Sequence, residues 1–503
     1  MYPSNDAHTC EWHKRALALQ AELDEVQARL DALIRRVFGT KSETMPSKDR
    51  ALKEGKPSGK NGPDAQSKRR ERAKIRKGLV ERAITHPVPD GGCECKHCGG
   101  MADRPIGKGR VTVVYEFTPA SIEQENHTQQ TLACRCGRLV VTAPPPVKVA
   151  DKLQHGPKLI AQIVVSRTLD SLPFYRQQWQ FGRLGIPLNR STMCELYHRA
   201  AELVAPIYRC VLDEIAADQM VMGDETHLNM HGIGDGKSLP GYMWTFRTYE
   251  RIAYVFDPSR SGDVPLAVLG NSEGVLLTDA YAGYSRLYKL KHRLRAACLA
   301  HVRREFFDAR STAESAVDEI LALILVVYRV EDKAREQGIL RTPAHRALRQ
   351  AEGRPAMQRL NTRLLAEQAL WTPRSRMGKA IAYALKQWGA LCLFLDDENI
   401  PPDNNLSENA LRIIALGRKN WQLVGHKEAG QNTAILQTLM SCCVLAGVNP
   451  LEYLADVLIR VQTHPDKDIA ELLPERWKAA RDAEHAAREA IRAAEDERSR
   501  AAA

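Results

Sequence analysis

Three acidic side chains from distant parts of the sequence have the types and surroundings of a divalent-cation site. Asp224 and Asp279 each follow a short apolar run that predicts a buried strand. Glu408 lies in segment 401–418, where two prolines precede apolar residues at helical spacing. Because acids at strand ends lie where α/β folds bind substrates and metals, we expect the three carboxylates to converge on one site.

Each of these acids also has an ordinary explanation. Glu408 stands one helical turn before Arg412, so the two side chains alone would make a solvated i,i+4 ion pair. Single acids after strands are common turn residues. Glu225 and Asp403 adjoin the same motifs, and we expect both to point elsewhere. We expect His301, just beyond a fifth predicted strand, to pack in the core rather than to reach bound metals.

Longer ordered motifs give the acids a context. These are DET (224–226), TDAYAGY (278–284), NNLSENALR (404–412) and GRKNW (417–421). Together they resemble the DDE-type transposases of the insertion sequence 66 family, and the resemblance extends nearly end to end. It implies a metal-dependent enzyme of DNA transposition and recombination, in which Asp224 bridges two Mg²⁺ ions, Asp279 holds one and Glu408 the other.

The implied reaction explains why carboxylates are needed. Hydrolysis and strand transfer at a phosphodiester proceed by in-line attack, and two metal ions activate the attacking oxygen and stabilise the leaving one. Mg²⁺ prefers carboxylate oxygens and keeps several waters, so two aspartates and a glutamate suffice, and Mn²⁺ is an acceptable substitute. The expected cofactors are therefore two Mg²⁺ ions.

A cysteine cluster predicts one structural Zn²⁺. Cys95 and Cys98 have C-x-x-C spacing with glycines behind them, and Cys134 and Cys136 form a C-x-C pair at a distance typical of zinc ribbons. The family more often has C-x-x-C in the second half, and Cys93 and His97 are spare donors. A different ligand set, or a group of small core cysteines without metal, remains open.

The predicted fold class is multidomain α/β. Segments 241–247, 252–256 and 295–300 predict further strands, with a helix at 265–269 before the strand that leads into Asp279. This order is that of a ribonuclease-H-like catalytic core with a helical insertion. The predicted ranges are 213–308 for the first part of the core, 309–395 for the insertion and 396–436 for the second part with the Glu408 helix.

The remaining segments have distinct compositions. A heptad seam from Trp12 to Val37 predicts a coiled coil, with a helix docked on its own domain as the alternative. The expected organisation is a coiled-coil leader helix (1–40), a basic flexible linker (41–85), a zinc-ribbon-like module (86–146), a helical helix-turn-helix-like DNA-binding region (150–212), a C-terminal element (437–477) and a charged tail (478–503).

The charge of the chain favours a polyanionic partner. Its formal net charge is +11 and its pI is near 9.0, which favours double-stranded DNA, here the element ends and the target. Cations and an aromatic ring after Glu408 suit an unpaired DNA end, although a buried tryptophan or ordinary helix packing explains the same residues. The DNA-binding candidates are Arg190, Thr192, Arg412, Arg418, Lys419 and Trp421.

Partners and location follow from the same features. An intermolecular heptad seam makes the protein at least a dimer, and the family often encodes small companion proteins. No apolar run is long enough to span a bilayer and no signal peptide is evident, so we expect a cytoplasmic protein of bacterial origin, associated with the nucleoid when bound to DNA.

Two other functions compete with a transposase. One is a catalytically silent DNA-binding accessory or regulator of the element, which the presence of all three acids argues against. The other is a ribonuclease-H-like nuclease of another type, such as a resolvase. The coiled-coil leader, the cysteine module and the long insertion argue against this second alternative.

Overall fold

The computed structural model describes residues 122–127, 130–133, 140–142, 147–149, 153–232, 237–290 and 292–501. All of them belong to the unit Glu116–Ala503. The predicted coiled-coil helix, the basic linker and the four predicted zinc ligands lie outside the described residues. Of the predicted zinc module the structure describes little beyond a short antiparallel pair of strands, β1 (Thr131–Ala133) and β2 (Val140–Thr142).

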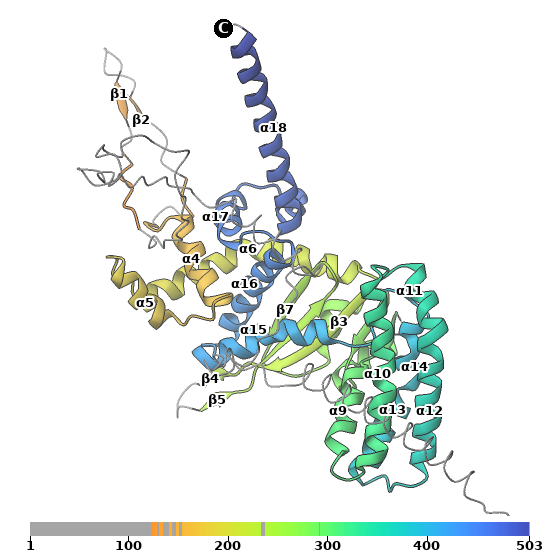
Figure 1. Cartoon of the computed structure of the whole chain (residues 1–503). Coiled ribbons are helices and arrows are strands. Elements are labelled where there is room, and N and C mark those ends of the chain that lie inside the picture. The colour runs from red at the N-terminus through yellow and green to blue at the C-terminus, as the bar shows by residue number, and fades with distance from the viewer. Residues whose placement is uncertain are drawn as a thin grey trace, which may run out of the picture. The chain divides into compact units, whose positions relative to one another are not determined.

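A five-stranded mixed sheet forms the centre of the described unit (Figure 1). Its order is β7-β6-β3-β8-β9; β3 pairs antiparallel with β6 and β6 with β7, whereas β3, β8 and β9 run parallel. The five predicted strands and the helix before the fourth are confirmed. They are β3 (Met220–His227), β6 (Tyr242–Arg247), β7 (Ile252–Asp257), α7 (Asp263–Leu269), β8 (Gly274–Thr278) and β9 (Arg293–Ala297).

Two strand boundaries differ from the prediction. β3 does not end before Asp224 but continues to His227, because β6 pairs with it through Thr245 and onward to Tyr242. β9 begins at Arg293 and ends at Ala297, two residues earlier than predicted at its start, because it pairs with the whole of β8. Asp224 therefore lies on a hydrogen-bonded strand and not in a turn.

A second small hairpin and two short helices lie in the segments that connect these strands. The hairpin is β4 (Met230–His231) with β5 (Ser238–Leu239), and Met230 also forms a parallel bridge with Val424. After β8 the chain forms the turn η1 (Ala282–Tyr284) and the helix α8 (Ser285–Lys289).

One face of the sheet is covered by helices from both ends of the described chain. Val221, Trp244 and Leu276 project from it into a core shared with these helices. The helices are α4 (Pro157–Thr168), α5 (Phe174–Arg183), α6 (Arg190–Ala217), α16 (Lys427–Leu445) and α17 (Pro450–Arg460). α5 and α6 form the predicted helical pair about Gly185, whose φ of +87° favours glycine. α6 starts at Arg190, however, and not after a cap at Ser191.

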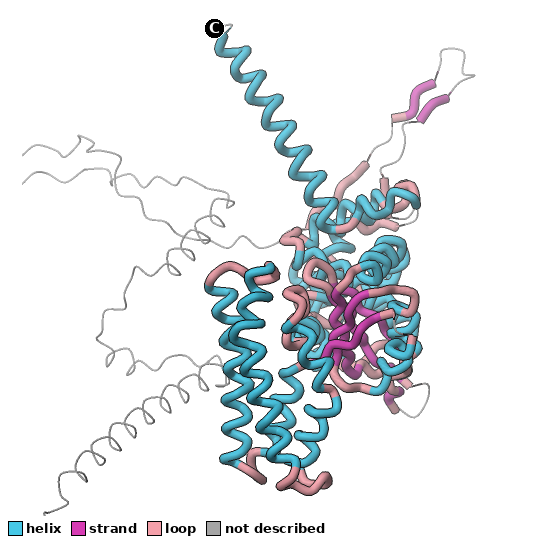
Figure 2. The backbone as a smooth tube through the Cα atoms, turned by 90° about the vertical axis from the view of Figure 1, so that its right-hand side faces the viewer, coloured by secondary structure: helices cyan, strands magenta, loops and turns pink. Residues whose placement is uncertain are grey.

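The opposite face carries a helical bundle, which Figure 2 shows beside the strands. Met222, Leu277 and Ala296 pack into its core together with Phe306 and Ile324. The segment after Ala309 is helical, as predicted for 309–395. The bundle comprises α9 (Leu299–Ala309), α10 (Glu314–Glu336), α11 (Pro343–Leu348), the π-helical turn η2 (Arg349–Gly353), α12 (Arg354–Gln368), α13 (Arg376–Lys386), α14 (Trp388–Cys392) and η3 (Leu393–Leu395).

Helix α15 (Asn405–Trp421) is the predicted Glu408 helix and lies against β3 and β6. Its buried positions are Ser407, Ala410, Leu411, Ile414 and Gly417. Among the apolar residues at helical spacing in this segment, Ala410 and Ile414 are buried, whereas Leu406 and Ile413 are only partly buried. The helix packs along a face rotated slightly from the one that its apolar residues indicate.

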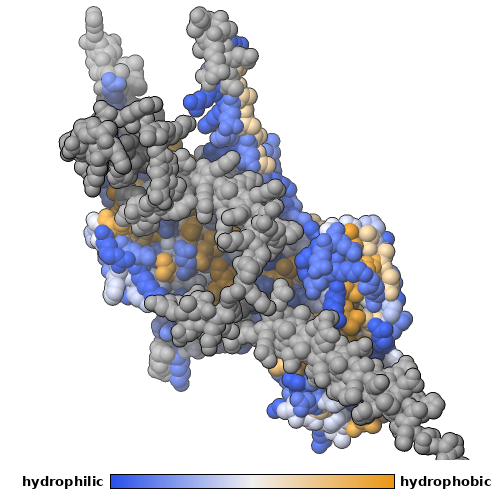
Figure 3. Space-filling model, in the orientation of Figure 1, coloured by the Kyte–Doolittle hydropathy of each residue, from blue (hydrophilic) through white to orange (hydrophobic). Residues whose placement is uncertain are grey.

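The C-terminal region ends in a long exposed helix. The turn η4 (Asp466–Leu472) leads into α18 (Pro474–Ala501), where Trp477 packs on Tyr453. Residues 481–490 are all exposed, and Figure 3 shows this helix as mostly hydrophilic with a pale apolar stripe. Among the described residues, no helix has the length and apolar character needed to cross a bilayer.

A buried arginine ties the bundle to the segment that precedes α15. Arg349 is 1% exposed and forms a two-pronged ion pair with Glu331, with nitrogen–oxygen distances of 2.8 and 2.7 Å. Its remaining nitrogen donates to the carbonyls of Phe394, Asp397 and Ile400 at 2.7 to 2.9 Å. The guanidinium therefore fixes the course of the chain just before Pro401.

We predict that Arg349→Ala destabilises the protein by about 3–5 kcal/mol, because it leaves Glu331 as an uncompensated buried charge. Urea unfolding followed by circular dichroism measures the change. The matched control is Arg346→Ala, since this exposed arginine is 3.6 Å from Glu398 and its loss should cost less than about 1 kcal/mol. Equal losses of stability in the two variants would contradict this structural role of Arg349.

Candidate active site

The strand register brings Asp224 and Asp279 to the same end of the sheet. β3 and β8 are parallel, with Met222 opposite Leu277. Two residues further along the chain from each of these are Asp224, still on β3, and Asp279, the first residue after β8. The alternation of side chains on β3 puts Asp224 on the same face as Met222. Met222 and Leu277 both pack into the core of the bundle, so Asp224 belongs to the bundle face of the sheet. The backbone amide of Tyr281 donates to Asp279 Oδ1 at 2.9 Å.

Glu408 reaches the same place because the chain before α15 is tied to two strand ends. The buried Asn404 side chain donates to the carbonyl of Gly223, the residue before Asp224, at 2.8 Å. Its backbone amide donates to the thiol sulfur of Cys298, just after β9, at 3.2 Å. The first turn of α15, which carries Glu408, is thereby held against β3 and β9.

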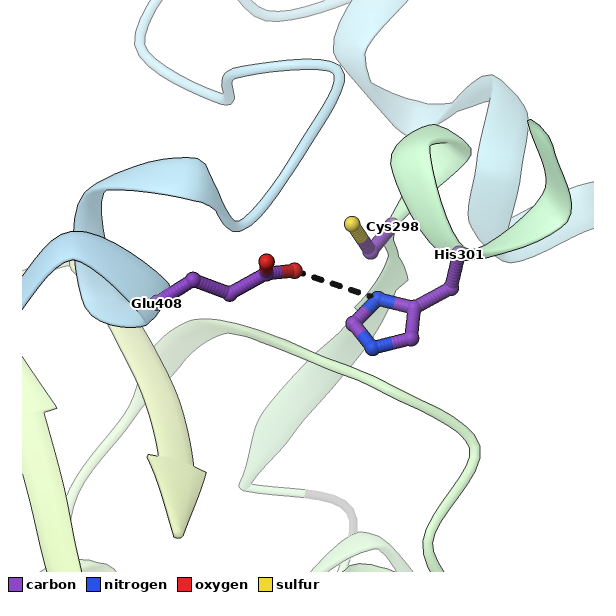
Figure 4. Close-up of side chains that lie close together, drawn as sticks. All are labelled: Cys298, His301 and Glu408. Carbon is purple, nitrogen blue, oxygen red and sulfur yellow. Dashed lines mark ion pairs between the residues drawn. The ribbon is translucent and has the colours of Figure 1, made fainter. Parts of the chain in front are cut away.

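Two side chains from α9 face the Glu408 carboxylate. His301 Nδ1 lies 3.6 Å from Glu408 Oε1 (Figure 4). An Arg304 nitrogen lies 3.3 Å from Oε2. Ligand atoms of Cys298, His301 and Glu408 all lie within 4.8 Å of one another. Glu408 Oε1 and His301 Nδ1 are buried, and neither has a hydrogen-bond partner. His301 therefore joins the site, contrary to the expectation that it only packs.

Crowded negative charge perturbs Asp224. The pKa of the Asp224 carboxyl is raised to about 7. Burial is the largest cause, and the negative charges of Glu225, Asp279 and Glu408 contribute to the same shift. Asp279 and Glu408 are therefore close enough to Asp224 to act on its charge, although the carboxylate oxygens of the three acids do not all lie within 4.8 Å of one another. A cation bound among them would relieve both the repulsion and the unfavourable burial of charge.

The two neighbouring acids have protein partners instead. Glu225 points to the opposite face of the sheet, where its carboxylate accepts hydrogen bonds from Arg260 Nε and from the Tyr284 hydroxyl, both at 3.0 Å. Asp403 accepts hydrogen bonds from the backbone and side-chain amides of Asn405 at 3.1 and 2.9 Å. Both carboxylates are engaged without a metal.

The DNA-binding candidates have different surroundings. Arg412 and Lys419 are exposed on α15, and the i,i+4 ion pair between Glu408 and Arg412 is not formed. Arg418 instead donates to Thr226 Oγ1 at 3.0 Å and to the carbonyl of His227, so it anchors α15 to the end of β3.

The other three candidates lie away from the acids. Arg190 is exposed at the first residue of α6, and Thr192 is partly buried one turn into it. Trp421 is partly buried at the last residue of α15, where the Arg167 guanidinium lies 5.0 Å from its ring centre.

Comparison with protein families decides the identity of this arrangement. Residues 152–432, which include all three acids, match the Transposase IS66 family. The chain belongs to this family. Residues 93–137 match the zinc-finger binding domain of transposase IS66, and residues 438–474 match the IS66 C-terminal element. Family membership indicates a function in DNA transposition with DNA as partner, and the zinc-finger match indicates a zinc-binding module.

Three related proteins of Sinorhizobium fredii (strain NBRC 101917 / NGR234) are similar over most of their length. The uncharacterized protein y4jD is 33% identical over 404 residues, 76% of this chain and 78% of that protein. Uncharacterized protein y4qI is 30% identical over 79% of this chain and 76% of its own length, and y4hP is 28% identical over 80% and 75%.

The raised pKa of Asp224 predicts how stability depends on pH. Between the pKa of an unfolded aspartate, about 3.9, and the folded value of about 7, the folded protein binds more protons than the unfolded chain. Stability contributed by the neutral carboxyl is therefore complete below the unfolded pKa and is lost as the pH rises through about 7.

We predict that Asp224→Asn, which cannot ionise, is more stable than the wild type at about pH 8 in EDTA, by at most about 4 kcal/mol. Near pH 4 the two proteins should differ little. Thermal melts across this range measure the effect, with the exposed Asp308→Asn as control. If the stability of the wild type and of Asp224→Asn changes with pH in the same way, the raised pKa of Asp224 is contradicted.

Proposed function

We propose that this protein is a DDE-type transposase that performs two-metal phosphodiester hydrolysis and strand transfer at the ends of a bacterial insertion sequence. The observation that carries the proposal is that Asp279, just after β8, and Glu408, on α15, both lie close enough to Asp224 on β3 to act on its charge. Three carboxylates with few protein donors among them are poorly stable alone and well suited to cations.

The residues present fit divalent cations. The donor set is dominated by carboxylates, the preferred ligands of Mg²⁺, and the buried Glu408 Oε1 is without a hydrogen-bond partner. Asp224 would bridge two ions, with Asp279 and Glu408 completing one each. Bound there, the ions supply activation of the attacking oxygen and stabilisation of the leaving one. The adjacent imidazole of His301 also suits Mn²⁺.

Residues around the acids position them. Arg304 and His301 hold the Glu408 carboxylate from α9, so its orientation does not depend on solvent. Burial raises the pKa of the Cys298 thiol to about 12, which keeps it neutral and makes it a poor competitor for the cations. The Glu225–Arg260 ion pair neutralises the acid next to Asp224 on the other face.

The fold supports a nuclease core. The strand order β7-β6-β3-β8-β9, with three antiparallel strands followed by two parallel ones, is the arrangement expected of a ribonuclease-H-like domain. In our proposal this core is split by the helical bundle into segments 213–308 and 396–436. Helices α5 and α6 form the helix-turn-helix-like DNA-binding region, with Arg190 and Thr192 at the start of its second helix.

The N-terminal segments complete the proposal. Cys95, Cys98, Cys134 and Cys136 would hold one structural Zn²⁺, which is consistent with the zinc-finger match over residues 93–137. The heptad seam in residues 1–40 would join two copies, so that one assembly handles two DNA ends. Small proteins from the same element are candidate companions.

The decisive test is cleavage and strand transfer on a labelled duplex that carries the element's end. With Mg²⁺, we expect Asp224→Asn, Asp279→Asn and Glu408→Gln each to lose at least about a thousandfold in rate while DNA binding is kept, because each removes a ligand of the reacting centre. Asp403→Asn is the matched control and should retain activity within a fewfold, since its carboxylate is already engaged by Asn405.

Two results would reject this assignment. If a triad variant cuts as fast as the wild type, that acid is not catalytic. If the wild type binds the end but stays inert, even with companion proteins supplied, the protein is a DNA-binding regulator of the element.

The zinc proposal has its own measurement. We predict about one Zn²⁺ per chain by elemental analysis of the purified protein, and loss of most of it in Cys95→Ser and in Cys134→Ser. Cys194→Ser is the matched control, because this cysteine lies on α6 and should leave the zinc content unchanged. Full zinc in the Cys134→Ser variant would show that Cys93 or His97 takes its place.

A further inference from the structure

A cavity of about 400 Å³ lies where the end of α15 meets the α4–α5 region, away from the three acids. This volume is in the range of small-ligand sites. Its lining combines a cation, aromatic rings and two amides. The lining residues are Arg167, Pro173, Tyr175, Asn420, Trp421 and Gln422.

Arg167 is a cation without a counter-charge. Its guanidinium carbon lies 4.6 Å from the ring centre of Phe174 and 5.0 Å from that of Trp421. Yet it forms no hydrogen bond or ion pair with any described residue. Burial lowers the pKa of Arg167, but an arginine stays charged in proteins. The Arg167 side chain is only partly buried where it lines the cavity, so its unpaired charge is open to an anion that enters there.

Trp421 lines the cavity, and its indole N–H donates no hydrogen bond within the described residues. Its Nε1 is buried and has no acceptor among the described residues. The ring packs on Gly417, where a Cβ would lie only 2.9 Å from it. Gln422 follows at a φ of +61°, which is unusual for a residue other than glycine and ends the helix at the tryptophan.

We propose that this cavity binds one unpaired nucleotide of a DNA strand, with its base stacked on Trp421 and its phosphate on Arg167. Aromatic stacking beside a cation is how proteins hold single-stranded nucleic acid, and the amides of Asn420 and Gln422 add donors and acceptors for base edges. This inference rests on the proposed function, because it makes the cavity a subsite for the DNA that the three acids cut.

Helix α15 sets the distance between the two sites. Glu408 and Trp421 are 13 residues apart on it, which is about 20 Å at the helical rise, or about six base pairs of DNA. The face between them is exposed and carries two cations without ion pairs. This face comprises Asn409, Arg412, Leu416 and Lys419. Trp421 lies on the other side of α15 from this face, so a strand that leaves the acids along it would turn around the C-terminal end of the helix to reach the cavity.

The test compares a duplex that has a short single-stranded extension containing 2-aminopurine with the matching blunt duplex. Full-length protein in EDTA should bind the extended DNA more tightly, and stacking should quench the 2-aminopurine fluorescence. We expect Trp421→Ala and Arg167→Met each to lose this preference by on the order of tenfold, and Trp421→Ala to lose the quenching as well. Trp421→Phe should keep most of both.

The control is Phe307→Ala, which removes an exposed aromatic ring of the helical bundle that does not line the cavity and should leave the preference intact. Equal binding of the two DNAs by the wild type, or an unchanged preference in both Trp421→Ala and Arg167→Met, would overturn the subsite. Circular dichroism identifies a variant that fails to fold, and each of the two positions tests the proposal alone.

The assay is independent of catalysis because EDTA is present. A preference for unpaired DNA in a protein that does not cut would leave the subsite standing and reject the transposase chemistry. A protein that cuts the DNA but shows no preference for the unpaired extension would support the transposase chemistry and reject the subsite.

Discussion

The pairing of β3 with β8 is the constraint on which the site depends. Their parallel register sets Met222 opposite Leu277, and this brings Asp224 on β3 and Asp279 just after β8 to the same end of the sheet. Burial raises the pKa of Asp224, and the negative charges of Glu225, Asp279 and Glu408 add to the shift. Met222 and Leu277, two residues before the acids, pack in the core of the bundle and so hold the strand register. Their burial offsets the electrostatic repulsion between the carboxylates.

Glu408 joins the aspartates through contacts made by chain far from it in sequence. Asn404 ties the start of α15 to Gly223, and Cys298 accepts its backbone amide, while Arg349 fixes the carbonyls of the segment that leads into Pro401. The bundle therefore has a structural role in the site. It buries the face of the sheet from which Asp224 projects, and it anchors the chain that delivers the third acid.

Much of the fold was predictable because the strands and helices have clear apolar periods. The five strands, the helical character of 309–395 and the pair of helices about Gly185 all follow from local pattern. The apolar periodicity does not reveal the register in which strands pair or which helices face each other. That Asp224 lies within β3, that His301 faces Glu408 and that Arg167 stacks on Trp421 each depend on pairings over long sequence separations. The motif spacing indicated the acids, and tertiary packing supplied their partners.

The central claim is that the three carboxylates bind divalent cations. Titration of the zinc-loaded protein with Mn²⁺, followed by electron paramagnetic resonance, tests it most directly because it requires neither DNA nor turnover. The account predicts saturable binding of about two Mn²⁺ ions per chain in the wild type and weaker binding in Glu408→Gln and Asp279→Asn. Unchanged Mn²⁺ affinity and number in both variants would contradict it.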